Sequence, residues 1–424
     1  MLSLLIFACK DPGFGDISAE VSEVVVTVPT VTWTTEEEAD SYVRYGIDGD
    51  LSMETPVSSG TDHSLPLLGL TASSEVSYQV VIDGEEVLES SVETLTTGDL
   101  PNDLPAFETA EDDMSAGTYM SVPVIGGVTA PVILTPEGQV TWYWFDERGL
   151  DVYRSFPSGD GTGVYYNAAS VSGDPAENSQ LVHVSWDGVT ETAIDVPLLA
   201  HDFVEHADGT LAMIVVEYRE GSDGEEVKGD QILEIAPDGT ETVVWSAWDC
   251  YDPEVHEGDD SGWTFANALD WDEQEQAYYI SFRSQSTITK INRETGACVW
   301  AVGESGDIEV DEEFEHQHQF QVLESTLLVF DNDGPGNATS RVIEYDLDVE
   351  GGEFTEVWSY QSDPPVYSFV LGDVHRFDGG DTLVTWSVAG QIERVNDAGE
   401  VSFKLNGALG DAFAFNTVLD SLYQ

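Results

Sequence analysis

The sequence predicts an all-β protein: a six-bladed β-propeller preceded by a small β-sandwich. Two observations point to this fold class. Six segments read as a strand, a tight turn and a second strand, and their turn glycines are 50, 51, 57, 56 and 47 residues apart. Repeats of about this length, made of short strands, are typical of propeller blades. In addition, no segment has convincing helical periodicity.

The six repeated segments consist of β-rich runs around a turn, and in three of them an acidic residue directly precedes the turn glycine. Glycine supplies the positive φ that such turns need, so the pattern predicts hairpins, each joining the outer two strands of a blade. The segments are 132–144, 181–194, 232–245, 288–300, 342–358 and 392–403, with turn glycines Gly138, Gly188, Gly239, Gly296, Gly352 and Gly399.

Four polar residues recur in one register of the repeat, each about ten residues before a hydrophobic strand. They are His201, Asn267, His318 and Asp373. If each begins the innermost strand of a blade, all four converge on one mouth of the central channel. Arg283 ends the strand that pairs with the one begun by Asn267, so we expect it at the same mouth.

The composition supports a folded protein with an extreme charge. The 424 residues include 11 Trp, 16 Tyr and 17 Phe, and 82 acidic residues face 13 basic ones, for a net charge of −69. Such a surface repels nucleic acid and anionic membranes, so no nucleic-acid partner is expected. The main interpretation is solubility in a salty setting, where ions screen self-repulsion. A dedicated cation-binding surface is the alternative.

The N-terminus and the cysteines indicate export. Residues 1–9 form a short apolar run ending Ile-Phe-Ala-Cys, similar to a bacterial lipobox, although the usual basic residues before it are missing. We expect Cys9 to carry a lipid anchor, with the protein periplasmic or surface-facing on the outer membrane. An ordinary N-terminal strand is the alternative. Cys250 and Cys298 lie near the outer strands of successive repeats and could pair in an oxidising compartment.

The chain divides into four parts by pattern. Trp33, Tyr45, Leu70 and Tyr78, with short alternating strands around them, resemble a fibronectin type III sandwich. The expected parts are a signal and tether over 1–19, this sandwich over 20–97, a Pro/Asp-rich linker over 98–118 and the propeller over 119–424.

Two imidazoles, an amide and a guanidinium at one mouth would form an oxyanion site. Arginine offers paired donors that suit sulfate or phosphate, and a neutral imidazole is a nucleophile near neutral pH. The chemistry indicated is transfer of a tetrahedral anionic group through a covalent histidine. The alternative is a set of satisfied structural polar groups lining a solvated channel.

A family resemblance makes this chemistry specific. The segments that carry it are 263–270, 281–283, 288–296, 317–318, 330–332, 340–346, 367–369 and 372–373. In order and spacing they resemble the bacterial arylsulfate sulfotransferases. The resemblance implies a six-bladed propeller with an N-terminal β-sandwich that moves sulfate from a phenolic ester to a phenol acceptor. It implies no nucleotide sulfate donor.

The resemblance also implies residue roles. His318 matches the transiently sulfated histidine and His201 a histidine that helps to hold the sulfate. Asn267 and Arg283 match the residues that bind the sulfate oxygens. The family usually has a histidine where this chain has Phe265, so one sulfate-binding or proton-shuttling group is missing.

A second departure concerns support of the nucleophile. Gln319 stands where the family commonly has Asp, and carboxylates in such positions support a catalytic imidazolium. His316 could compensate, because residues two apart on a strand share a face. Asp373 is a further candidate for support.

Three rival interpretations remain open. His316 and His318 with His201 and Asp202 could hold a metal, although no metal site is expected. Residues 331–336 loosely resemble a calcium loop but fit a turn better. The absence of nucleotide-binding motifs argues against a cofactor. The third interpretation is a catalytically inactive propeller that binds a ligand or a protein partner.

Overall fold

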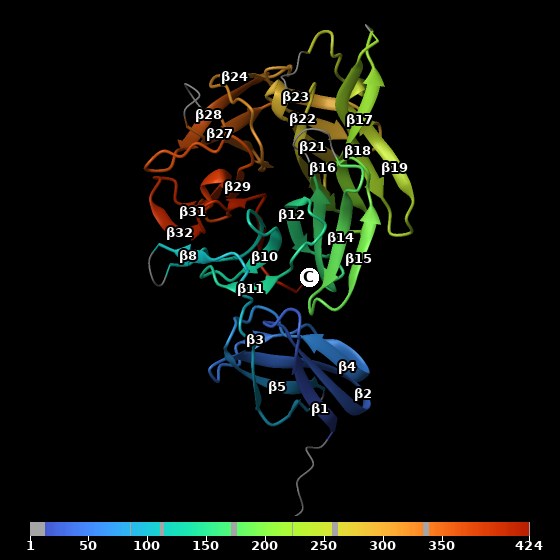
Figure 1. Cartoon of the computed structure of the whole chain (residues 1–424), viewed down its shortest axis with the longest axis vertical. Coiled ribbons are helices and arrows are strands. Elements are labelled where there is room, and N and C mark those ends of the chain that lie inside the picture. Colours follow the sequence, from blue (N-terminus) through green and yellow to red (C-terminus); the bar gives the residue numbers. More distant parts are fainter. Residues whose placement is uncertain are drawn as a thin grey trace, which may run out of the picture.

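The computed structural model describes most of the chain and is all-β. The described residues are 13–84, 86–110, 114–170, 176–222, 224–256, 262–333 and 339–423. Besides strands, they contain three short 3₁₀ helices, η1 (Ala247–Asp249), η2 (Arg283–Gln285) and η3 (Ser387–Ala389). Figure 1 shows a ring of small sheets with a separate β domain beside it.

The ring consists of six blades, in which the chain runs from the central channel outwards. Blade one contains β9 (Tyr119–Ile125), β10 (Ala130–Leu134) and β11 (Val140–Tyr143). Blade two contains β12 (Asp151–Pro157), β13 (Gly163–Ala169), β14 (Gln180–Ser185) and β15 (Glu191–Asp195). Blade three contains β16 (Leu199–Glu205), β17 (Leu211–Glu220), β18 (Glu226–Ile235) and β19 (Glu241–Ser246).

The other three blades follow the same plan. Blade four contains β20 (Ala266–Asp272), β21 (Ala277–Phe282), β22 (Thr287–Asn292) and β23 (Cys298–Gly303). Blade five contains β25 (Phe320–Val322), β26 (Thr326–Asp331), β27 (Arg341–Asp348) and β28 (Glu353–Tyr360), with β24 (Glu309–Val310) parallel to β28. Blade six contains β29 (Asp373–Arg376), β30 (Thr382–Trp386), β31 (Gln391–Val395) and β32 (Val401–Gly407).

The six-bladed prediction is therefore confirmed, and so is the place of the turn glycines. Each of the six lies between the outer two strands of a blade, with φ between 67° and 82°. Burial also depends on the place of a strand in its blade. In blade one the interior strand β10 is buried along its whole length, because neighbouring blades cover both of its faces. In blade two every residue of the outermost strand β15 is exposed. Hence inner strands read as continuous apolar runs.

Two distant segments close the ring. In blade one the innermost position is taken by β33 (Ala412–Phe413) and β34 (Thr417–Leu419), which pair with β9. On the outer side of blade six, β8 (Phe107–Thr109) pairs with β32. Part of the segment expected to be a linker is thus a propeller strand. The rings of Phe107 and Phe413 stack with centroids 5.9 Å apart.

The N-terminal domain is one hydrogen-bonded sheet centred on a long strand. Its strands are β1 (Phe14–Val21), β2 (Pro29–Ile47), β3 (Met53–Glu54), β4 (Ser58–Pro66), β5 (Glu75–Asp83), β6 (Leu88–Glu89) and β7 (Glu93–Thr96). β2 pairs with β1, β3, β4 and β5 around a core that includes Trp33, Tyr45 and Tyr78. Since β1 begins at Phe14, residues 14–19 are strand rather than tether. The fibronectin type III assignment stays a prediction.

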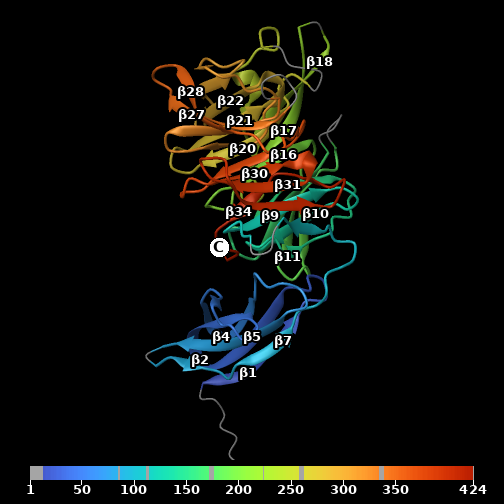
Figure 2. The same cartoon turned by 90° about the vertical axis from the view of Figure 1, so that its left-hand side faces the viewer.

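This domain lies at the rim of the propeller, nearest to β11 of blade one (Figure 2), and its buried contacts include residues of blades one and two. Val25, Val28 and Leu68 belong to the same buried cluster as Trp142 and Trp186 of these blades. Because the core is shared across the junction, the domain docks by burial of apolar surface and not by surface polar contacts alone.

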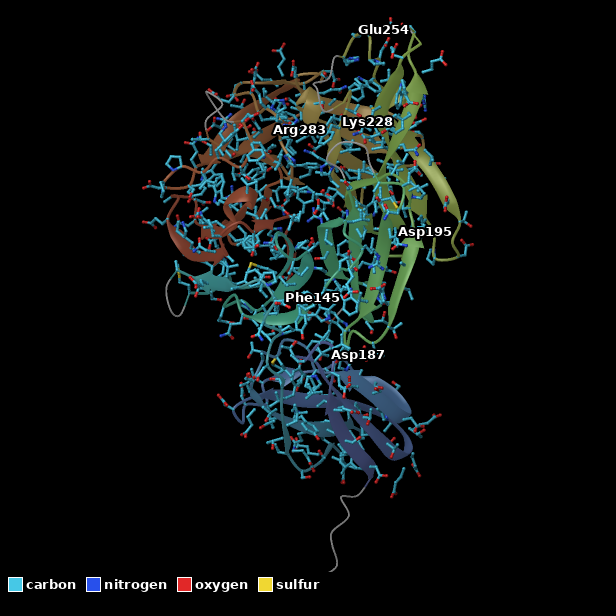
Figure 3. The ribbon with its side chains drawn as sticks, viewed as in Figure 1. Phe145, Asp187, Asp195, Lys228, Glu254 and Arg283 are labelled. Atoms are coloured by element: carbon cyan, nitrogen blue, oxygen red, sulfur yellow. A yellow bond between two sulfur atoms is a disulfide. The ribbon has the colours of Figure 1, made fainter. Side chains whose placement is uncertain are left out.

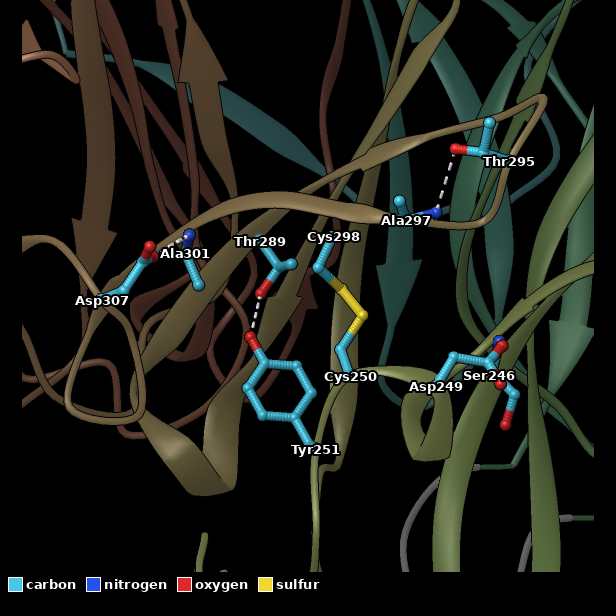
Figure 4. Close-up of a disulfide and its surroundings, with 10 residues drawn as sticks. All are labelled: Ser246, Asp249, Cys250, Tyr251, Thr289, Thr295, Ala297, Cys298, Ala301 and Asp307. Atoms are coloured by element: carbon cyan, nitrogen blue, oxygen red, sulfur yellow. Dashed lines mark hydrogen bonds between the residues drawn. A yellow bond between two sulfur atoms is a disulfide. The ribbon is translucent and has the colours of Figure 1, made fainter.

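A disulfide joins blades three and four. Cys250 follows β19 and η1, Cys298 begins β23, and their Cα atoms are 6.2 Å apart (Figure 4). Beside it the Tyr251 hydroxyl lies 2.5 Å from that of Thr289. Cys9 lies outside the described residues, so its lipidation stays a prediction. In the described part of the chain, no helix has the length and hydropathy required to span a membrane.

Candidate active site

The two histidines singled out by the repeat meet at the centre of the ring. His201 lies on β16 and Asn267 on β20, the innermost strands of blades three and four, and His318 comes two residues before the innermost strand of blade five. The ring centroids of His201 and His318 are 6.3 Å apart. The expectation that these side chains converge on one end of the channel is thus met for the histidines.

A hydrogen-bond chain selects one tautomer of His318. The amide nitrogen of Asn332 donates to the carbonyl oxygens of Ser368 (2.6 Å) and Leu371 (2.7 Å). Its Oδ1 therefore faces His318 as an acceptor, 2.8 Å from Nδ1. An acceptor at this position requires a proton on Nδ1, so the lone pair of the neutral imidazole lies on Nε2.

Both imidazoles are neutral in this environment. His318 is 1% exposed and His201 is 4% exposed. Burial, followed by the proximity of His201, places the pKa of His318 well below its usual value. Burial likewise lowers the pKa of His201 to about 4. A buried imidazole that stays unprotonated at neutral pH keeps a lone pair for attack on an electrophile.

His201 uses Nδ1 in a similar way. This atom lies 3.2 Å from the carbonyl oxygen of Ala266. A carbonyl only accepts, so Nδ1 carries the proton and Nε2 carries the lone pair. His201 can then donate a hydrogen bond to an oxyanion from Nε2 only as an imidazolium.

Asn267 presents an unused acceptor. Its amide nitrogen donates to the carbonyl oxygen of Gln317 at 2.6 Å. Its Oδ1 is fully buried and has no hydrogen-bond partner. A buried acceptor without a partner is costly, by about 1–3 kcal/mol, and native proteins keep few of them.

Two cations surround the residue that replaces the family histidine. Arg283 was expected to end the strand, but β21 ends at Phe282 and Arg283 begins η2 directly after it. Its guanidinium carbon is 5.9 Å from the centroid of the Phe265 ring. Lys228 approaches the same ring to 5.2 Å, and the Phe265 ring is 5.3 Å from that of His201. Lys228 and Arg283 both lie in the part of the propeller remote from the N-terminal domain (Figure 3). Two of the 13 basic residues of a protein of net charge −69 therefore lie beside Phe265.

Phe265 itself adopts an unusual backbone conformation. Its φ is 50°, in the left-handed region that bulky residues rarely occupy. Backbone strain of this kind costs about 1–3 kcal/mol and clusters at functional sites. The conformation turns the chain just before β20 and places the ring between His201 and the two cations.

Asp373 does not join this group. It begins β29 as expected, but its carboxylate lies 3.5 Å from Arg154 and lines a different cavity, which contains neither of the two histidines. The reason is a shift in register. The backbone N–H of Gln319 donates to the carbonyl oxygen of Gly372 at 3.4 Å. This pairs Asp373 with Gln319 and not with His318, so Asp373 lies further along the channel axis than His318 does.

His316 does not share a face with His318 either. The alternation rule needs an extended strand, but His316 precedes β25 and has a φ of 54°. Its Nδ1 lies 2.5 Å from Asp333. Among the described residues, no three His, Cys, Asp or Glu side chains are placed to share a metal ion.

Asp202, the residue after His201, explains the role of Gln319. Asp202 is fully buried and accepts from Arg154 Nε (2.9 Å), Gln319 Nε2 (2.7 Å) and the backbone N–H of Leu269 (3.0 Å). Gln319 thus ties blade five to blade three, whereas the side chain that contacts Nδ1 of His318 is Asn332.

Sequence reasoning missed Asn332 and Lys228 as site residues. Asn332 follows β26, the strand that pairs with the one His318 precedes, and this hairpin relation was the available signal. Lys228 is one of four lysines in the chain, which could have marked it. Its place beside Phe265 depends on packing between blades three and four.

Residues 129–407 match the family model described as Arylsulfotransferase (ASST). No curated protein matches the chain.

Solved structures resemble the chain only in fold. A protein of unknown function from Bacteroides caccae aligns with 11% identity and a TM-score of 0.44, covering 72% of this chain and 99% of that one. A periplasmic gluconolactonase from Pseudomonas aeruginosa aligns with 13% identity and a TM-score of 0.37, covering 90% of this chain and 99% of that one.

Proposed function

Since this chain belongs to the arylsulfotransferase family, we propose that it transfers a sulfuryl group from an aryl sulfate ester to a phenol through His318. The observation that carries the proposal is the orientation of His318. Oδ1 of Asn332 lies 2.8 Å from Nδ1 of His318 and accepts its proton in a hydrogen bond, so the neutral imidazole keeps its lone pair on Nε2. No nucleotide sulfate donor takes part in this reaction.

In the first step the Nε2 lone pair of His318 attacks the sulfur of the aryl sulfate. The N–S bond forms, the S–O bond to the aryl group breaks, and the phenolate leaves with the bonding electrons. The product is an N-sulfated imidazolium whose Nδ1–H still donates to the Asn332 oxygen. A hydrogen bond to a charged donor is worth about 1.5–3 kcal/mol, so Asn332 stabilises this intermediate.

In the second step the acceptor phenol takes the sulfuryl group. Its oxygen attacks sulfur, the N–S bond breaks and the electron pair returns to Nε2 of His318. The phenolic proton passes to the departed phenolate or to solvent, so protons balance over the cycle. The reaction exchanges one aryl sulfate for another and needs no further reactant.

Charge at the mouth favours both steps. Arg283 and Lys228 flank Phe265, and their positive potential attracts the sulfate ester and offsets the charge that develops on its oxygens. After burial, the positive charges of Lys228 and Arg283 also help to keep the pKa of His201 low. When an anionic ester binds, it offsets that effect, and His201 can take up a proton and donate it from Nε2.

The test is transfer from 4-nitrophenyl sulfate to phenol in wild type and His318→Ala. We expect His318→Ala to abolish nitrophenol release, because the covalent route is lost. His201→Ala and Arg283→Ala should slow it by about 10²–10³, as for loss of one oxyanion donor. His183→Ala, a histidine on β14 of blade two, is the matched control and should leave the rate unchanged.

Trapping a sulfated peptide that contains His318 after donor addition would identify the nucleophile directly. Transfer that persists undiminished in His318→Ala would show that the proposed nucleophile is wrong. No transfer by the wild-type protein, together with binding of aryl sulfates, would favour the inactive binding propeller that Phe265 suggests.

A further inference from the structure

A large cavity opens at the opposite end of the propeller from the histidines. It has a volume of about 1040 Å³ and is lined from the later parts of the innermost strands and the turns after them, in all six blades. His201, near the start of β16, and His318, which precedes β25, do not line the cavity. A volume of this size is at the upper end of the range for small-molecule sites.

Carboxylates outnumber cations at the floor of this cavity. Arg154 donates to Asp202 from Nε (2.9 Å) and Nη2 (3.2 Å), and its Nη1 lies 3.5 Å from Asp373. Asp270 also lines the cavity and interacts with Arg154 and Asp202 through their charges. Three carboxyl groups therefore interact with one guanidinium, so acidic groups exceed cations at the floor.

The rim of the cavity carries further carboxylate side chains. Its side chains include Asp160, Glu205, Asp208 and Asp420, with His206 and His375 between them. Burial lowers the pKa of both histidines, so they do not supply the missing charge at neutral pH.

A buried amide points independently to a ligand. Asn416 is 7% exposed, lines the cavity, and has no hydrogen-bond partner for either Nδ2 or Oδ1. Its backbone is in use, because its carbonyl oxygen accepts from Arg154 Nη1 at 3.2 Å. Leaving an amide buried and unpaired costs about 1–3 kcal/mol, and a bound molecule with polar groups would remove that cost.

The walls decide which class of cation fits. Phe156 and Phe203 line the cavity with ring centroids 4.7 Å apart, and Phe320 also lines it. Aromatic faces bind alkylammonium groups and the carbon chains between them. In the described residues no three acidic, His or Cys side chains can share a metal ion, and the volume far exceeds that of one ion.

We propose that this cavity binds an organic polycation of the polyamine class. One ammonium group lies between Asp270 and Asp373, a neighbouring N–H donates to Oδ1 of Asn416, and the carbon chain packs on Phe156 and Phe203. The site stands independently of sulfate transfer at the other end of the channel. The raised pKa of Asp373, about 7 through burial, fits a carboxylate that exchanges its proton for a bound cation.

Calorimetric titration of the full chain with spermidine, near neutral pH and at a fixed moderate salt concentration, tests the proposal. We expect one tight molecule per chain, at least tenfold weaker in Asp270→Asn and in Asn416→Ala. Asn416→Ala is the sharper variant, because a side chain without partners can be removed with no loss of melting temperature. Asp195→Asn, an exposed carboxylate on β15, is the matched control and should bind as wild type does.

Two further readouts separate this site from the general acidity of the surface. Spermidine binding should release protons from the protein, which is detected as a dependence of the binding enthalpy on the ionisation enthalpy of the buffer. Asp373→Asn should abolish this proton release. Weak, multiple binding that is equal in wild type, Asn416→Ala and Asp195→Asn would overturn the proposal. So would Ca²⁺ or Mg²⁺ displacing spermidine with equal stoichiometry, because the ligand class would then be a metal ion.

Discussion

Replacing Asn332 tests whether the hydrogen bond to His318 matters for chemistry. Asn332→Ala removes the acceptor 2.8 Å from Nδ1 and the donor to the carbonyls of Ser368 and Leu371. The bond to the charged intermediate is worth about 1.5–3 kcal/mol, which converts to a loss of about 10- to 150-fold in kcat. Two lost neutral bonds should also lower the free energy of unfolding by about 1–3 kcal/mol.

The conservative variant separates chemistry from stability. Asn332→Asp keeps an oxygen at Nδ1 and adds negative charge, which raises the pKa of His318 and should move the acidic limb of the kcat profile to higher pH. It loses both donors to the carbonyls, so its stability should fall as in Asn332→Ala. A purely structural role predicts equal stability losses and no shift of the pH profile.

The assay is nitrophenol release from 4-nitrophenyl sulfate with phenol as acceptor, followed across pH, with melting temperatures measured in parallel. Asn396→Ala is the matched control, because this amide accepts from the backbone N–H of Ala398 and Glu400 in the outer turn of blade six. Activity of Asn332→Ala within threefold of wild type, with His318 still required, would refute the reasoning.

Four other predictions follow from the structure. Phe265→His should raise sulfate transfer without loss of stability, because histidine tolerates a φ of 50° better than phenylalanine does; an unchanged rate would count against a weakened enzyme. Cys250→Ser with Cys298→Ser opens a link of sequence separation 48 and should cost about 2–4 kcal/mol in chemical unfolding; an unchanged midpoint would contradict it. Burial raises the pKa of Asp373 to about 7. The protonated side chain therefore stabilises the fold fully below the unfolded-state pKa of the group, and this stabilisation is lost as pH rises through the folded-state pKa. Asp373→Asn should therefore flatten the pH dependence of the melting temperature over this window. Added salt should raise the melting temperature of the wild type, because it screens the net charge of −69; a flat response would mean that the carboxylates are already paired.

The blades could be predicted from the sequence, because hairpin turns and covered strands leave local patterns of turn glycines and apolar runs, such as that around Gly138. The place of His318 beside His201 follows from the repeat register. The same register fails for Asp373, since loops before the innermost strands differ in length and shift the levels. Asn332 could have been found by the hairpin relation that placed Arg283, because it follows the strand that pairs with the one His318 precedes.

The closure of the ring has a consequence for biosynthesis. Residues 412–419 complete the blade whose strands β9 to β11 are translated almost three hundred residues earlier. Until they emerge from the ribosome, β9 presents an open edge that can pair with another chain. Tyr423, just beyond this segment, donates from its hydroxyl to the carbonyl of Pro66 in the N-terminal domain. A nascent chain that stops before residue 412 therefore lacks both contacts, and we expect such fragments to aggregate or be degraded and not to accumulate as five-bladed intermediates.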